Sequence, residues 1–320
     1  MRTRRIVPLL VTLPLALTAA LSAPAQAFPG ARSHHRPAHL THLDLASGQQ
    51  PENLAPLPDG SVAVTFALTG QVAEISRTGR VRVLARLPVP TDGDTPVLHS
   101  KVFAAGIDRT DDGTLYVAVS TGTSSGTGIW RVREHRPPTR VAALPADSLL
   151  NGLAVDERRG RIYVADSTGS TIWTVPLRGG TPTRWLRDAA LAPESGFLGA
   201  NGLKLHDGAV WVSNLDAGTL LRVPVRADGR AGAAREVLRG LGSVDDFAFT
   251  GRGDELLATD IKADTLTRIV PGKSRTTVLN SADGLSGPTA VALRGRRIVV
   301  TSAAYFTAHD PNVLSVPLAR

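Results

Sequence analysis

The chain has 320 residues, a formal net charge of +8 and no cysteine, and 42% of its residues are hydrophobic. The absence of cysteine excludes disulfides, thiol chemistry and lipoprotein attachment, so the fold must rely on its core. Three arginines lie in the first five positions and the others are scattered, which predicts a solvated surface and argues against nucleic-acid binding.

The N-terminus has the features of an export segment. A basic start precedes a short, proline-broken apolar run over residues 6–21, and Ala25-Gln26-Ala27 forms a cleavage motif. We therefore expect a secretory signal peptide over 1–27, exported by the Sec or the twin-arginine route, and no membrane association after its removal. Residues 28–38 are expected to form a flexible leader, and the mature protein is expected to be secreted.

Six similar units follow one another along the rest of the chain. In each unit an inner apolar run is followed by a turn with Asp or Gly and by two β-type runs. The second runs are SVAVT (61–65), TLYVAVS (114–120), RIYVAD (161–166), AVWVSN (209–214), ELLATD (255–260) and RIVVTS (297–302). Third runs such as GIWRV (128–132) and TIWTVP (171–176) follow in five units.

The spacing of the units predicts the fold. Aligned on the start of the inner run, they are 44 to 51 residues apart and begin at Glu52, Phe103, Asn151, Asn201, Asp245 and Thr289. No helical periodicity separates them. Four-stranded units of this length indicate an all-β, six-bladed β-propeller over 39–320, which we expect to be a monomer.

The last unit ends before its fourth strand. The alternating segment HLTHLDLA (39–46) precedes the first unit and belongs to none. We expect this N-terminal strand to complete the last blade beside the 313–317 run and to close the ring.

The aligned positions carry an unusual set of side chains. Asn-Gly at 151 and at 201 is a common turn pair, which offers a purely structural explanation. A turn does not require Glu52 or Asp245 at the equivalent places, however. Equivalent positions of propeller blades face one another across the axis, so Glu52, Asn151, Asn201 and Asp245 are predicted to bind one cation. Their hard oxygen atoms suit Ca²⁺, with Mg²⁺ or Mn²⁺ as poorer fits.

Four stretches of the sequence resemble the senescence-marker-protein / gluconolactonase / regucalcin family, and more distantly the paraoxonases. They are PENLAPLPDGSVAVT, NGLAVDERRGRIYVADS, NGLKLHDGAVWVSN and VDDFAFTGRGDELLATD. The resemblance covers about 50–311. It implies that Glu52, Asn151, Asn201 and Asp245 hold one divalent cation at the channel floor, with Asp246 as an added ligand in the paraoxonase pattern. It further implies hydrolysis of lactones or esters.

In the hydrolytic mechanism, Asp245 or Asp246 is the catalytic residue that accepts a proton from water, while the cation supplies Lewis acidity. The Arg-x-Asn-Asp motif that contacts sugar hydroxyls in gluconolactonases is absent before Asn151. The small-molecule substrate therefore need not be a sugar lactone. The segment 187–200 is expected to cover the channel mouth. Two alternatives are a non-catalytic binding propeller with a structural metal and a metal-dependent lyase.

Overall fold

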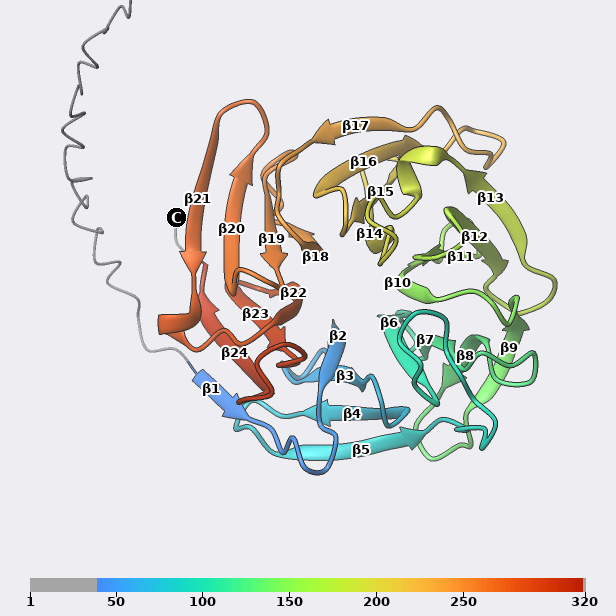
Figure 1. Ribbon diagram of the computed structural model, residues 1–320, viewed down its shortest axis with the longest axis horizontal. Helices are drawn as coiled ribbons and strands as arrows, with labels where there is room; N and C mark the ends of the chain where they lie inside the picture. Colours follow the sequence, from blue (N-terminus) through green and yellow to red (C-terminus); the bar gives the residue numbers. More distant parts are fainter. Residues whose placement is uncertain (1–38, 319–320) are drawn as a thin grey trace, which may run out of the picture. The chain divides into compact units, whose positions relative to one another are not determined.

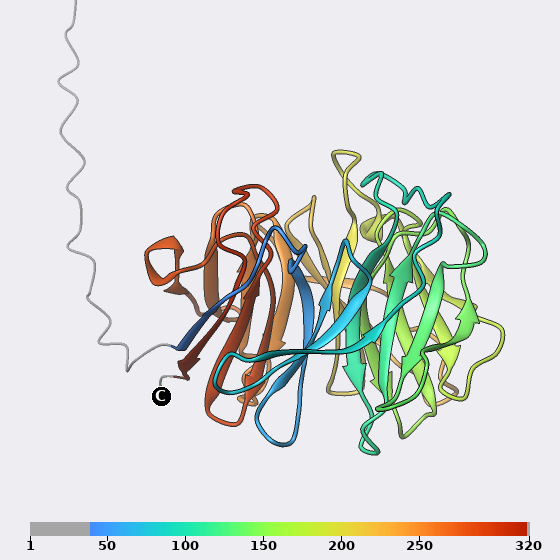
Figure 2. The same ribbon diagram turned by 90° about the horizontal axis from the view of Figure 1, so that it is seen from below.

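Six antiparallel sheets of four strands each surround a central axis (Figure 1). The computed structural model describes residues 39–318, so the predicted signal peptide and leader lie outside the described residues. Seen from the side, the strands of this ring run between its two faces (Figure 2). The prediction of an all-β, six-bladed propeller is confirmed.

The sheets follow the chain order, with the first strand of each blade innermost (Figure 1). Blade one holds β2 (Pro51–Pro56), β3 (Val62–Phe66), β4 (Gln71–Ile75) and β5 (Val81–Arg86). Blade two holds β6 (Phe103–Arg109), β7 (Leu115–Ser120), β8 (Gly128–Val132) and β9 (Thr139–Ala143). Blade three holds β10 (Leu150–Asp156), β11 (Arg161–Asp166), β12 (Thr171–Pro176) and β13 (Thr183–Arg187).

The second half of the ring repeats this order. Blade four holds β14 (Ala200–His206), β15 (Ala209–Asn214), β16 (Thr219–Pro224) and β17 (Arg235–Leu238). Blade five holds β18 (Val244–Phe249), β19 (Leu256–Asp260), β20 (Thr265–Val270) and β21 (Ser274–Leu279). Blade six holds β22 (Pro288–Arg294), β23 (Arg297–Ser302), β24 (Asn312–Pro317) and β1 (His39–His42).

Strand β1 closes the ring as predicted. It pairs antiparallel with β24, so that His39 is opposite Ser315 and His42 is opposite Asn312. Leu43, just after β1, is buried among residues of blades one and six. The outer edge of blade six is therefore covered by the other end of the chain.

The core consists of layers between blades. One cluster of buried side chains lies at each of the six junctions between neighbouring blades. At the junction of blades three and four, for example, Tyr163 and Ile172 pack against Val210 and Leu221. Each blade therefore buries both of its faces only when the ring is complete.

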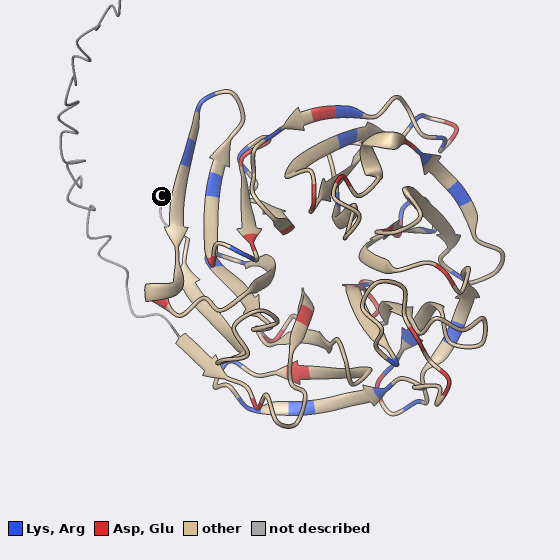
Figure 3. Cartoon of the chain, in the orientation of Figure 1, with Lys and Arg blue, Asp and Glu red and all other residues tan. Residues whose placement is uncertain are grey.

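The helices in the described part of the chain are two short 3-10 turns, η1 (Ala189–Leu191) and η2 (Ser281–Asp283). Neither is long enough to cross a membrane. Basic residues are spread over the outer strands of several blades, including β13, β17 and β21, rather than gathered on one (Figure 3).

Candidate metal centre

The innermost strand of every blade carries a register shift close to its first residue. The residues at these shifts, which we call the ring positions, are Glu52, Ala105, Asn151, Asn201, Asp245 and Thr289. Five of them are the residues aligned from the sequence. In blade two the prediction of Phe103 was wrong by two residues, because Ile107 pairs with Val117 just as Leu153 pairs with Val164.

Hydroxyl side chains fix the ring positions of neighbouring blades. Thr65 in blade one donates a hydrogen bond of 2.7 Å to the carbonyl oxygen of Ala105 in blade two. Ser213 in blade four donates one of 3.0 Å to the carbonyl oxygen of Asp245 in blade five. These bonds are buried, so they hold the ring positions of adjacent blades in a defined relation.

The two Asn-Gly pairs lie inside strands and do not form turns. Gly152 and Gly202 belong to β10 and β14, and neither has a positive φ. A Cβ atom on Gly152 would lie 2.4 Å from the carbonyl oxygen of Asn201. The glycine is therefore required because the innermost strand of the next blade approaches the backbone closely.

Three of the predicted ligands line one cavity of about 220 Å³ at the start of the innermost strands, namely Glu52, Asn201 and Asp245. All three are buried in the fold. Asn151 is also buried, at the equivalent position of blade three, but it is not part of the cavity lining.

The two carboxyl groups of the cavity are costly to ionise without a partner. Burial is the main cause that raises the pKa of Glu52 to about 7, and the charge of Asp246 adds to the shift. Burial and the charge of Glu52 raise the pKa of Asp245 well above its usual range. The hydroxyl of Tyr305 donates a hydrogen bond of 2.7 Å to Glu52 Oε2 and offsets part of the cost.

The side chains at four of the ring positions carry donor atoms that suit a hard cation. The side-chain Nδ2 atoms of Asn151 and Asn201 are buried and make no hydrogen bond of normal geometry with the described residues. Asn201 nevertheless lies close enough to Asp245 to lower the pKa of that carboxyl, against the larger effect of burial. Two carboxylates and two amide oxygens form the kind of ligand set that Ca²⁺ prefers.

Asp246 is engaged elsewhere. Its Oδ2 atom forms an ion pair of 2.9 Å with Nζ of Lys204, from β14 of the neighbouring blade. Burial raises the pKa of Asp246, and Lys204 opposes that shift. Lys204 and Tyr305 were not predicted. Lys204 lies three residues after Asn201 on β14. Tyr305 lies in the loop that follows β23, and this strand ends on the side of the ring where the cavity lies.

Tyr305 also lines the cavity, and the rest of the wall is apolar. It is formed by Leu68, Leu98, Phe103, Phe197, Leu198, Leu215, Ile261 and Phe306. Phe197 and Leu198 come from the 187–200 segment, so this segment contributes to the cavity wall, and its covering of the channel mouth stays a prediction. His99 is exposed, lies 3.2 Å from an oxygen of Asp94 and does not line the cavity.

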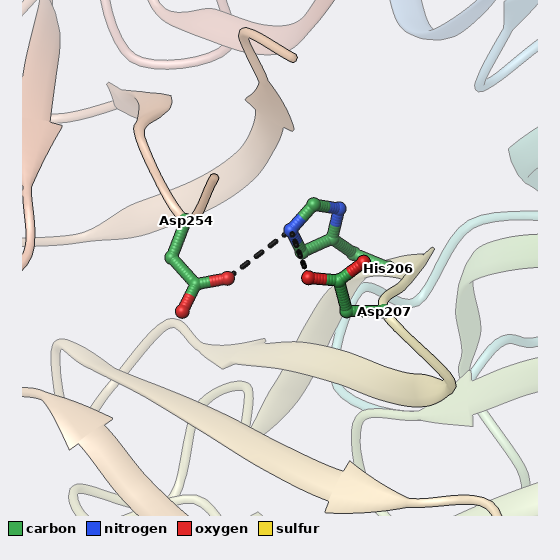
Figure 4. Close-up of side chains that lie close together, drawn as sticks. All are labelled: His206, Asp207 and Asp254. Atoms are coloured by element: carbon green, nitrogen blue, oxygen red, sulfur yellow. Dashed lines mark hydrogen bonds and ion pairs between the residues drawn. The ribbon is translucent and has the colours of Figure 1, made fainter. Parts of the chain in front are cut away.

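A second group of potential metal ligands lies at the other end of β14. Nε2 of His206 is 3.1 Å from Asp254 Oδ1 and 3.7 Å from Asp207 Oδ2 (Figure 4). Their ligand atoms lie within 4.8 Å of one another, as a shared metal ion requires. Both carboxylates are largely exposed, however, and they approach the same nitrogen, which an imidazole in an ordinary surface ion pair also explains.

The comparisons with known proteins show similarity in structure. No family model matches the sequence, and no curated protein matches it. A gluconolactonase from Xanthomonas campestris has a TM-score of 0.63 at 15% identity, with 89% of this chain and 96% of that chain covered.

Two further structures resemble the chain. The calcium-binding protein regucalcin from Agrobacterium tumefaciens has a TM-score of 0.62 at 16% identity, with 85% of this chain and 92% of that one covered. Virginiamycin B lyase from Staphylococcus aureus has a TM-score of 0.57 at 14% identity, with 88% and 100% covered. The chain thus shares its propeller fold with gluconolactonase, regucalcin and lyase structures at low sequence identity.

Proposed function

We propose that the protein is a divalent-metal-dependent hydrolase of lactones or esters, and that its active site is the cavity lined by Glu52, Asn201 and Asp245. One observation carries the proposal. Two buried carboxyl groups, whose ionisation is unfavourable without a partner, line the same cavity as a set of apolar side chains.

Glu52, Asn151, Asn201 and Asp245 would hold the cation, and their oxygen atoms favour Ca²⁺ over Mg²⁺ or Mn²⁺. When bound, such a cation supplies Lewis acidity for a carbonyl oxygen and positive charge that keeps the carboxylates ionised. Tyr305 orients Glu52 through its hydrogen bond.

Asp245 is the better candidate for the general base. It lines the cavity, where its carboxylate can accept a proton from an attacking water. Asp246 is a weaker candidate, because it does not line the cavity and its carboxylate is paired with Lys204. The apolar wall binds the remainder of the substrate and excludes water around the reacting carbonyl.

The apolar side chains of the cavity wall favour substrates with an apolar substituent over sugar lactones. A sugar lactone carries several hydroxyl groups, and these would lose hydrogen bonds to water without finding partners among leucine and phenylalanine side chains. An alkyl or aryl group gains free energy from the same transfer. We therefore propose lactones or esters with an apolar substituent.

The test is a hydrolysis assay with alkyl γ- and δ-lactones, phenyl acetate and glucono-δ-lactone, each with added Ca²⁺ and with a chelator. Hydrolysis of the apolar substrates that requires Ca²⁺ is expected. Asp245→Asn should abolish turnover while the circular dichroism spectrum is unchanged. Phe197→Ala should raise KM for an alkyl lactone by about tenfold, because one side of the wall is lost.

Asp254→Asn is the matched control, because it removes a carboxylate from the other candidate metal group. Full activity is expected for this variant. Metal-dependent activity that is lost in Asp254→Asn and kept in Asp245→Asn would contradict the proposed site. Calcium binding without turnover of any substrate would indicate a binding propeller, and a product with a new double bond would indicate a lyase.

We further propose that the enzyme acts on its small-molecule substrate outside the cytoplasm, after removal of the 1–27 segment. The basic start and the cleavage motif of the sequence support this. N-terminal sequencing of the exported protein should give Phe28 as the first residue, and an exported protein that begins with Met1 would contradict the expectation.

A further inference from the structure

A second cavity of about 230 Å³ lies at the junction of blades six and one, and basic and hydroxyl side chains line it together with four apolar ones. Arg294 is the last residue of β22 and Arg297 the first of β23, while Arg77 lies in the turn between β4 and β5. Thr289 and Arg294 are five residues apart on β22. At the rise of a strand this is roughly 16 Å, which places the second cavity toward the opposite face of the ring from Glu52.

Three arginines line this cavity, and no carboxylate is part of its lining. The lining is completed by His39, Thr41, Val62, Ile75, Ser76, Val299, Val313 and Ser315. Burial lowers the pKa of Arg294, and the charges of Arg297 and Arg77 lower it further, while nearby Asp59 offsets part of the effect. Within residues 39–318, none of these three arginines forms an ion pair.

Two of the arginines are held in place by the fold. Arg297 donates from Nε to the hydroxyl of Ser315 at 2.9 Å and from Nη2 to its carbonyl oxygen at 2.8 Å. Arg294 reaches across the junction and donates to the carbonyl oxygen of Gly60 in blade one. A guanidinium has five N–H donors, so both groups retain donors for a ligand. The order imposed on them reduces the entropy that binding would cost.

We propose that this cavity binds a tetrahedral oxyanion, namely a phosphate or sulfate group, free or on a small ester. Fixed guanidinium groups and hydroxyls are the donors that such oxygens prefer. The volume is below the range of about 300–1,000 Å³ that is typical of sites for drug-sized ligands, so the ligand is small. An anion also removes the mutual repulsion of the three arginines.

The cavity lies beside the strand that closes the ring, so ligand binding should affect the stability of the ring. His39 and Thr41 belong to β1, the strand that closes the ring, and both line the cavity. A ligand held there contacts the closing strand, blade six and blade one together. Binding should therefore stabilise the closed ring and be lost when β1 is removed.

The experiment measures the thermal unfolding midpoint and the heat of binding of the full chain at constant ionic strength. The probes are inorganic phosphate, sulfate, glycerol 3-phosphate and acetate. Saturable stabilisation by the tetrahedral anions is expected, with acetate much weaker. Arg77→Gln, whose side chain is exposed, and Arg294→Gln should each weaken phosphate binding by about tenfold. Arg136→Gln, in an exposed turn of blade two, is the matched control and should bind like the parent.

Tighter binding of glycerol 3-phosphate than of inorganic phosphate would identify a phosphate ester as the ligand, and the reverse order would identify the free ion. Either result supports the site. Three results would overturn it: no saturation with phosphate or sulfate, equal binding of acetate, or affinity that falls as much in Arg136→Gln as in Arg77→Gln. None of these readouts depends on the hydrolase activity.

Discussion

Replacing Gly152 by alanine tests how closely the innermost strands approach one another. The new Cβ would lie 2.4 Å from the carbonyl oxygen of Asn201 and 2.4 Å from the amide nitrogen of Leu203. Ordinary contacts begin at 3.4 Å, so blades three and four would have to separate by about 1 Å. The obstructing atoms belong to the backbone of β14, which is hydrogen-bonded to β15, so they cannot rotate away. Overpacking of this kind typically costs about 1–3 kcal/mol, and we expect the upper end of that range.

The free energy of unfolding can be measured by equilibrium denaturation in urea, followed by circular dichroism. Gly232→Ala is the matched control, because its Cβ would be 3.1 Å from the nearest atom, a side-chain carbon of Pro224, in a segment outside the strands. A separation of the blades would also weaken Ca²⁺ binding. If Gly152→Ala unfolds within about 0.5 kcal/mol of the parent, the close approach of the strands is wrong and so is the explanation of the Asn-Gly pair.

Four further predictions can be checked with the same protein. A chain that begins after Ala46 should lose several kcal/mol of stability because β1 and Leu43 are gone, whereas one that begins at His39 should not, as thermal unfolding will show. Asn151→Gly should retain the parent's stability but weaken Ca²⁺ binding in calorimetry; undiminished affinity would favour a purely structural role. Without metal, Glu52 should contribute stability below its unfolded pKa of 4.5 that is lost, by about 3 kcal/mol, as pH rises through its folded pKa of about 7. Glu52→Gln should lose the part of this dependence that Glu52 contributes, while the raised pKa of Asp245 leaves a remainder of the same sign; an unchanged slope would contradict the raised pKa of Glu52. Lys204→Met should cost about 3 kcal/mol in denaturation by leaving Asp246 buried and unpaired, and adding Asp246→Asn should recover part of the loss.

The sequence was sufficient for the number of blades and for the closing strand, because both follow from repeated patterns. The register of blade two was not predictable in the same way. The ring position there is Ala105, within a run of small residues that offers no polar side chain for alignment. Phe103, two residues earlier, faces the same cavity as the ring positions, and this made the wrong alignment plausible.

The charged partners in the channel depend on contacts between blades. Lys204 reaches Asp246 because β14 and β18 are neighbours in space, although the two residues are 42 positions apart in sequence. Tyr305 and Glu52 are 253 positions apart and meet only because blade six closes against blade one. A pattern within one repeat contains no information about either pair. The identity of five of the six ring residues was therefore accessible from the sequence, but their electrostatic environment was not.

The pairing of β1 with β24 also has a consequence for the order in which the ring folds and unfolds. His39 and Ser315 are opposite each other, although almost the whole chain separates them. Closing so long a loop in an unstructured chain is entropically expensive, whereas a stack of formed blades already brings its two ends together. We expect an open ring to be the last intermediate in folding, and the junction of blades six and one to be the first to open again. Hydrogen exchange should then be faster in the amides that join β1 to β24 than in those that join the two outermost strands of the other blades.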